Sequence, residues 1–225
     1  MEETKHKGVY SEERRGRKSF FTRNLIPGKK VYDERLVREG GIEYREWNPK
    51  KSKIGAALMK GLHKLPILPG SNVLYLGCAS GTTVSHISDI IANNGLVVGI
   101  DFAPRVMRDF VFLSEVRKNI IPILGDCKKP ETYALRIFEK HDVLVQDIAQ
   151  KEQVNIFLKN LQFLKQGGYA LLAIKARSID VAASPKKIFS DVKRELEKHI
   201  TIEEYMTLDP YELDHCFFLL KKSDD

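Results

Sequence analysis

Four ionisable side chains stand where predicted helices and strands begin or end, which is where a side chain can reach a ligand. Lys53 begins a predicted helix, and His215 begins the last predicted strand. Asp147 and Lys175 each end an apolar strand. Such a set suits transfer of a group to a hydroxyl, because an alcohol is a poor nucleophile at neutral pH and needs both positioning and a proton acceptor.

The residue that accepts this proton stays open. Asp147 and Lys175 are expected on adjacent strands, where the two can pair, and such a pair favours a charged lysine. A lysine acts as a base only when desolvation or nearby cations lower its pKa, and Lys53 and a cationic ligand would supply this. Taken singly, Lys53 also fits a surface helix, and His215 also fits a packed histidine in a hairpin.

A turn with two glycines, Gly77 and Gly81, joins an apolar strand to an amphipathic helix. Such a turn lets backbone N–H groups and the positive end of a helix face a ligand. Its spacing lacks the third glycine of a dinucleotide fingerprint, and no lysine follows Gly81 as a phosphate loop requires. The turn therefore predicts binding of an adenosyl group without pyrophosphate, for which S-adenosylmethionine is the usual ligand. A purely structural turn of small residues is the alternative.

Three aspartates stand at the predicted carboxyl ends of strands, where doubly wound sheets bind their ligands. Asp101 lies 20 residues after Gly81 and could accept hydrogen bonds from both ribose hydroxyls, with Phe102 against the adenine. Asp126 is placed to read the adenine amino edge, and Asp147 ends the next strand. One acid at such a place is more often a helix cap or turn former. Three of them together with the glycine turn favour a nucleotide-type site.

From residue 51 onward, predicted strands and helices alternate, which indicates a doubly wound α/β sheet. A turn at Asp209-Pro210 separates the last two strands and predicts an antiparallel C-terminal hairpin. Seven strands with that reversal describe a Rossmann-like methyltransferase, whereas a dehydrogenase would continue with another βαβ unit. We expect strands at Asn72–Leu76, Leu96–Asp101, Ile120–Gly125, Val143–Asp147, Tyr169–Lys175, Ile200–Thr207 and Cys216–Lys221, and helices at Lys53–His63, Thr83–Ala92, Pro104–Lys118, Thr132–Phe138, Glu152–Phe163 and Pro185–Lys198.

The first quarter of the chain differs from the rest in pattern and in charge. We expect a small antiparallel β domain over residues 1–50, with a loose start, and the methyltransferase domain over 51–225. Residues 1–53 carry 15 Lys and Arg against 9 Asp and Glu, which accounts for nearly all of the net charge of +7. This surplus indicates a basic surface for a polyanion, most often nucleic acid, or else a solvated charged face. The short strands are expected at Val9-Tyr10, Ser19–Thr22, Lys30–Tyr32 and Ile42–Trp47.

Composition narrows the cellular setting. No apolar run reaches the roughly 18–20 residues of a membrane helix, and the charged N-terminus is unlike a signal peptide. The three cysteines, Cys78, Cys127 and Cys216, suit neither a zinc site nor a disulfide framework. We therefore expect a cytosolic or nuclear protein with reduced, buried thiols, no metal and no membrane partner.

Four segments resemble the fibrillarin family, the 2′-O-methyltransferases of box C/D guide-RNA particles. They are Tyr44–Lys53, Tyr75–His86, Gln146–Gln150 and Pro210–His215, and the similarity runs from about residue 8 to the C-terminus. The chain departs from the family without losing a catalytic group: two cysteines stand where alanine is usual and a lysine where arginine is usual. The Gly/Arg-rich tail of eukaryotic members is absent, which favours an archaeal-type, cytoplasmic member. The departures are Cys78, Cys127 and Lys51.

The resemblance implies that methyl groups pass from S-adenosylmethionine to ribose 2′-hydroxyls of rRNA, and possibly of tRNA, at sites chosen by guide RNA. It implies a Nop-family scaffold protein and a kink-turn-binding protein as partners. It also implies a catalytic set of Lys53, Asp147, Lys175 and His215. The turn and the resemblance together predict donor contacts at Gly77, Ala79, Gly81, Thr82, Thr83, Asp101, Phe102, Asp126, Cys127, Asp147, Ile148, Ala149 and Gln150.

Three other functions compete with this one. A methyltransferase acting on protein or small molecules would share the donor site and differ in its product. A non-catalytic subunit of an RNA particle would show an eroded catalytic set, whereas all four family positions are filled here. A nicotinamide dehydrogenase conflicts with the glycine spacing and with the terminal hairpin.

Overall fold

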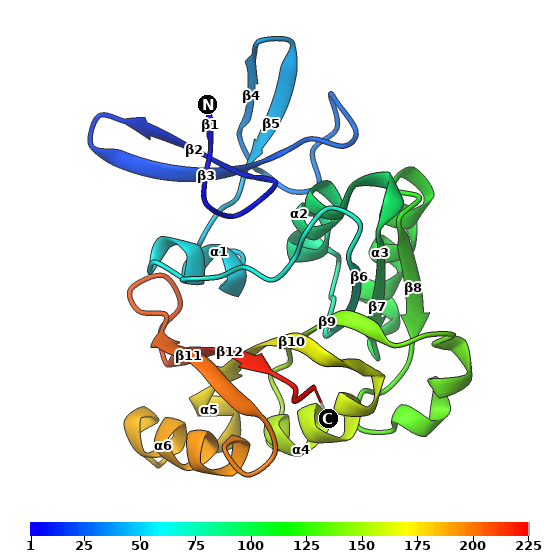
Figure 1. Cartoon of the computed structure of the whole chain (residues 1–225), viewed down its shortest axis with the longest axis vertical. Coiled ribbons are helices and arrows are strands. Elements are labelled where there is room, and N and C mark those ends of the chain that lie inside the picture. The colour runs from blue at the N-terminus through cyan, green and yellow to red at the C-terminus, as the bar shows by residue number, and fades with distance from the viewer. Residues whose placement is uncertain (225) are drawn as a thin grey trace.

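The computed structural model describes residues 1–224 and contains two β-sheets with helices between and around them (Figure 1). The larger sheet has the strand order β11-β12-β10-β9-β6-β7-β8. Its strands are parallel except for β12, which is antiparallel to both neighbours. This confirms the predicted methyltransferase sheet and its C-terminal hairpin. The strands are β6 (Asn72–Leu76), β7 (Leu96–Asp101), β8 (Ile120–Leu124), β9 (His141–Asp147), β10 (Leu164–Lys175), β11 (Thr201–Thr207) and β12 (His215–Lys221).

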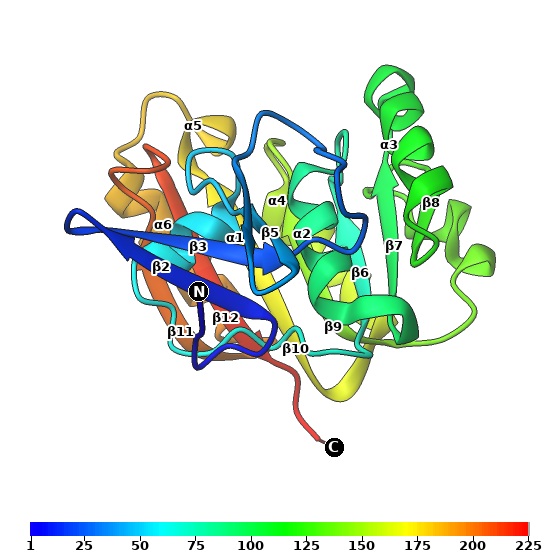
Figure 2. The same cartoon turned by 90° about the horizontal axis from the view of Figure 1, so that it is seen from above.

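Both faces of this sheet are buried. In β6, Val73 and Tyr75 face one core and Leu74 and Leu76 face the other, as the period of two in a strand requires. Helices α1 to α3 pack on the first face, and α4 and α6 pack on the second (Figure 2). This double cover explains why the strands read as continuous apolar runs. The helices are α1 (Lys53–Met59), α2 (Thr82–Ile91), α3 (Pro104–Val116), α4 (Gln153–Asn160), α5 (Ala176–Ile179) and α6 (Pro185–Leu196).

The N-terminal strands form a second, antiparallel sheet in the order β1-β2-β3-β5-β4. The prediction of a strand at Lys30–Tyr32 is wrong, because the Glu34 carboxylate accepts hydrogen bonds from the Val31 and Tyr32 amides and holds a loop. The prediction of a loose start is also wrong, since β1 pairs with β2. The strands are β1 (Glu2–Glu3), β2 (Val9–Arg14), β3 (Arg17–Arg23), β4 (Leu36–Glu39) and β5 (Ile42–Glu46).

A buried network of charges joins this small sheet to α2. The Arg45 guanidinium is fully buried and donates to Glu34, Asp89 and Ser85 at 2.8–2.9 Å. Asp89 also accepts from Arg117 at 2.6 Å. Breaking a buried charge pair typically costs several kcal/mol, so these contacts fix the two sheets relative to one another. The domain boundary at residue 50 stays a prediction.

Three further differences concern the ends and types of elements. The helix predicted at Thr132–Phe138 is wrong: two 3₁₀ turns, Pro130–Thr132 and Ala134–Arg136, stand there, with the Leu135 side chain 93% exposed. Tyr133 is buried in the core, but two separate short turns do not supply the run of consecutive hydrogen bonds that makes an α-helix stable. Helix α1 ends four residues earlier than predicted, before Gly61 at a φ of +91°. The short helix α5 was not predicted. Within the described residues, no helix is long and apolar enough to cross a membrane.

Candidate active site

The glycine turn lies against the end of β9. Gly77 has a φ of +81°, and its amide donates to the Ile100 carbonyl at 2.9 Å. A Cβ at this position would stand 2.3 Å from the Asp147 carbonyl oxygen, so only glycine fits. At Gly81 a Cβ would instead meet Leu113 at 2.4 Å, so that glycine lets α2 and α3 pack closely.

A cleft of about 240 Å³ opens between this turn and the ends of β7 and β9. Its position at the carboxyl ends of parallel strands is the one expected for a ligand site in a doubly wound sheet. All of its lining residues are among the predicted donor contacts: Gly77, Ala79, Asp101, Phe102, Cys127, Asp147, Ile148, Ala149 and Gln150.

Two polar groups in the cleft fit an adenosyl ligand. The Asp101 carboxylate is held in place because it accepts from the Ala79 amide at 2.9 Å and from the Ala103 amide at 3.0 Å. Each oxygen keeps a lone pair that can accept from a ribose hydroxyl. The Gln150 side-chain oxygen is buried and has no hydrogen-bond partner among residues 1–224. A buried acceptor without a partner is costly, and a ligand that donates to it would remove that cost.

The remaining four predicted donor contacts are not among the lining residues of this cleft. Thr83 is buried, and its hydroxyl donates to Ser52 at 3.1 Å, which ties α2 to the start of α1. Asp126 accepts from the Lys128 amide at 3.0 Å and shapes its own turn. Gly81 and Thr82 stand at the start of α2. Their donor contacts stay predictions.

Lys53 lies between two carboxylates. Its ammonium is 3.6 Å from Asp147 Oδ2 and 3.5 Å from Glu212 Oε1, and all three side chains are about one-fifth to one-quarter exposed. The expected ion pair between Asp147 and Lys175 does not form, because Asp147 pairs in register with Ala173, two residues before Lys175. Glu212 lies in the segment Pro210–His215, yet nothing in its sequence setting indicated a contact with Lys53.

Lys175 and His215 are cross-strand neighbours, paired in register at the junction of β10 and β12. Gln153, which no motif had singled out, fixes the main chain here: its side chain accepts from the Lys175 amide at 2.9 Å and donates to the Lys175 carbonyl at 3.1 Å. The Lys175 ammonium forms no ion pair with any described residue. The site thus holds one lysine, Lys53, between two carboxylates, and a second lysine, Lys175, with no carboxylate partner among the described residues.

The His215 ring has a defined tautomer. Its Nδ1 lies 2.7 Å from the Leu213 carbonyl oxygen, which can only accept, so Nδ1 carries the hydrogen. In the neutral ring Nε2 is then an acceptor. The ring is 7% exposed.

The cysteines take no part in nucleophilic chemistry. All three are free and buried, as predicted. Burial raises the pKa of the Cys78 and Cys216 thiols well above their usual range and that of Cys127 to about 12. A thiol in this state is inert at neutral pH.

The strand order, the antiparallel β12 and the cleft beyond β6, β7 and β9 define an α/β methyltransferase fold. The fibrillarin family model matches residues 1–224. A fibrillarin-like rRNA/tRNA 2′-O-methyltransferase of Pyrococcus horikoshii is 48% identical over 227 residues, covering 99% of this chain and 100% of that protein. The chain belongs to the fibrillarin family.

Two solved structures show the same likeness. One is Aeropyrum pernix fibrillarin in complex with natively bound S-adenosyl-L-methionine, with a TM-score of 0.89 and 46% identity, covering 97% of this chain and 96% of that one. The other is a fibrillarin/Nop5p complex, with a TM-score of 0.86 and 37% identity, covering 96% of this chain and 98% of that one.

Proposed function

We propose that this chain transfers a methyl group from S-adenosylmethionine to the ribose 2′-hydroxyl of rRNA and tRNA, at sites chosen by box C/D guide RNA. The observation that carries the proposal is the position of Asp147. This residue lines the cleft beside the glycine turn, and its carboxylate is 3.6 Å from the Lys53 ammonium. A donor in the cleft and a hydroxyl at the lysine would therefore meet at one carboxylate.

The bound donor supplies an electrophilic methyl group on a sulfonium. The residues of the chain supply the position of the acceptor and the removal of its proton. Lys53, between Asp147 and Glu212, is a fixed hydrogen-bond donor that orients the hydroxyl oxygen. The Nε2 of His215, an acceptor in the neutral ring, takes up the proton, and Lys175, its neighbour across β10 and β12, is a second hydrogen-bond donor beside the hydroxyl. Most of the rate enhancement comes from holding the oxygen in line with the methyl group.

The likeness to the fibrillarin/Nop5p complex supports a Nop-family scaffold as a partner of this chain. We extend the proposal to a guide RNA and a kink-turn-binding protein in the same particle, and to a cytoplasmic location. A guide that selects targets by base pairing would explain why the chain needs only a modest net charge of +7.

The test is methyl transfer in a reconstituted particle with labelled S-adenosylmethionine, with and without guide RNA. We expect label on the ribose of the guide-paired nucleotide only. In Lys175→Ala the label is lost while donor binding persists, and in Lys186→Ala, on the exposed side of α6, both are unchanged. Label on protein or on a small molecule would favour another methyltransferase, and no label at all would favour a non-catalytic subunit.

A further inference from the structure

The hairpin β2–β3 extends well beyond the sheet to which it belongs. Strand β5 pairs with β3 only at Phe21–Arg23, and β1 pairs with β2 only at Tyr10 and Ser11. The segment 12–19 therefore has no third strand beside it. Figure 2 shows this part of the hairpin reaching past the body of the molecule. A two-stranded arm of this kind adds little to stability.

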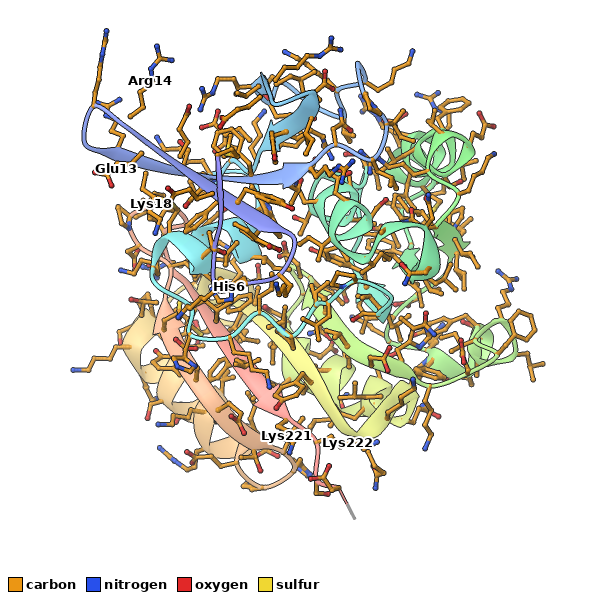
Figure 3. All side chains as sticks on the ribbon, turned by 45° about the horizontal axis from the view of Figure 1, so that its top comes forward. His6, Glu13, Arg14, Lys18, Lys221 and Lys222 are labelled. Carbon is orange, nitrogen blue, oxygen red and sulfur yellow. The ribbon has the colours of Figure 1, made fainter. Side chains whose placement is uncertain are left out.

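The tip of this arm is strongly basic. Arg14, Arg15, Arg17 and Lys18 are all exposed, and none forms an ion pair with a described residue. Arg14 pairs in register with Arg17, and like charges directly opposite one another destabilise a hairpin. Lys18 stands opposite Glu13. Figure 3 shows Arg14 directed into solvent at the tip. The arm thus carries a charge repulsion that the folded chain does not relieve.

Two acids at the base of the arm, Glu12 and Glu46, are already engaged by a cation. Arg35 donates to Glu12 at 3.0 Å and to Glu46 at 3.1 Å. All three side chains line a hollow of about 690 Å³ together with Arg14, Arg15 and Arg17 of the tip. Because Arg35 engages both carboxylates, the tip arginines remain available to an external anion.

A second hollow lies between the arm and the body of the molecule. It measures about 660 Å³ and is lined by Arg17 and Lys18 on the arm and by Lys50 and Tyr211 on the body. Tyr211 is followed directly by Glu212, whose carboxylate contacts the Lys53 ammonium. A chain of anionic groups lying in this hollow would run from the hairpin tip toward the segment that carries Glu212.

We propose that the β2–β3 arm binds the ribose–phosphate backbone of the RNA beside the nucleotide that is methylated. The inference rests on the proposed function. The planar guanidinium groups of Arg14 and Arg17 match phosphate oxygens in two-point hydrogen bonds. RNA fits better than an acidic protein surface because the second hollow borders Tyr211, next in the chain to the Glu212 that contacts Lys53, where the proposed function places a ribose. The contacts are sequence-independent, since they reach only the backbone.

The test compares Arg14→Ala/Arg17→Ala with Lys186→Ala/Lys187→Ala, which removes the same charge from α6. The scaffold-bound protein is titrated with a guide–target duplex at several salt concentrations. Two lost phosphate contacts lower the slope of log Kd against log salt by about 1.8, so between 50 and 200 mM salt the wild type loses about tenfold more affinity than the arm variant. The α6 variant keeps the wild-type slope.

Two readouts separate this role from a structural one. The arm variant keeps its affinity for the donor and unfolds at the same or a higher temperature, because a repulsive pair has been removed. Its KM for target RNA rises. An unchanged slope and KM would overturn the inference, and so would loss of scaffold binding with RNA binding intact. If the RNA affinity of the wild-type protein depends on salt as expected but no methyl group is placed on ribose, the proposed function is wrong and the binding of RNA by the arm is still supported.

Discussion

Replacing Gly77 with alanine would place a Cβ where the cleft meets Asp147, the carboxylate that we propose as part of the catalytic set. That atom would stand 2.3 Å from the Asp147 carbonyl oxygen and 3.1 Å from its carbonyl carbon. The obstacle is main chain, which cannot rotate away as a side chain can. The end of β9 must therefore move, and the Asp147 carboxylate must move with it, away from both the cleft and Lys53.

The size of the expected loss of stability follows from a comparison with Gly61. Gly61 has a similar φ of +91°, but a Cβ there would meet no atom within 4 Å. Gly61→Ala thus reports the conformational cost alone, about 1–2 kcal/mol. Gly77→Ala adds the overpacking cost, about 1–3 kcal/mol. In a chain of this length each kcal/mol lowers Tm by about 2–4 °C, so Gly77→Ala should melt roughly 2–12 °C below Gly61→Ala.

The assay has two parts, thermal unfolding and titration with S-adenosylmethionine. We expect donor affinity to fall about tenfold or more in Gly77→Ala, which is the effect of 1.4 kcal/mol of displaced contacts, and to stay unchanged in Gly61→Ala. Equal melting temperatures and equal donor affinities in the two variants would refute the reasoning. Weaker donor binding without the extra loss of stability would place the obstacle in the ligand rather than in β9.

Two other predictions concern charge. Glu212→Gln leaves the Lys53 ammonium with one carboxylate instead of two. The misplaced ammonium should lower kcat by up to about 100-fold, while the affinity for the donor stays the same. Single-turnover methyl transfer measures this effect, and Glu203→Gln, at an exposed position, is the control. Burial holds the pKa of His86 well below 6.5, so below about pH 6.5 only the unfolded chain binds that proton, and the free energy of unfolding should fall by up to about 1.4 kcal/mol per pH unit. Denaturant titrations should show a flatter profile in His86→Gln, and parallel profiles for the two proteins would contradict this.

The lining of the cleft could be predicted from the sequence for a geometric reason. Parallel strands end at one edge of a sheet, so residues that end apolar strands, such as Asp101 and Asp147, come together whatever the loops do. Every lining residue of the cleft belongs to such an end or to the turn beside it. The local sequence pattern is enough to predict the position of a residue when that position depends only on the strand to which it belongs.

The acceptor side depended on tertiary contacts that no local pattern carries. Glu212 reaches Lys53 through the conformation of the loop between β11 and β12, and Gln153 reaches Lys175 from the start of α4. The buried Arg45–Asp89 pair escaped prediction for a related reason: charged residues are expected at the surface unless they are paired, and their pairing joins two separate sheets.

On the proposed mechanism, the close approach of Gly77 to Asp147 would couple donor binding to the positioning of the acceptor. The glycine turn passes so close to Asp147 that a Cβ at Gly77 would meet its main chain, and the carboxylate of Asp147 lies 3.6 Å from the Lys53 ammonium. A ligand that orders the turn should therefore also order Lys53, which we propose orients the hydroxyl. Because the linkage is mutual, RNA in place at Lys53 should tighten donor binding by the same factor as the donor tightens RNA binding. With this coupling, the acceptor hydroxyl should be positioned best when the methyl donor is bound.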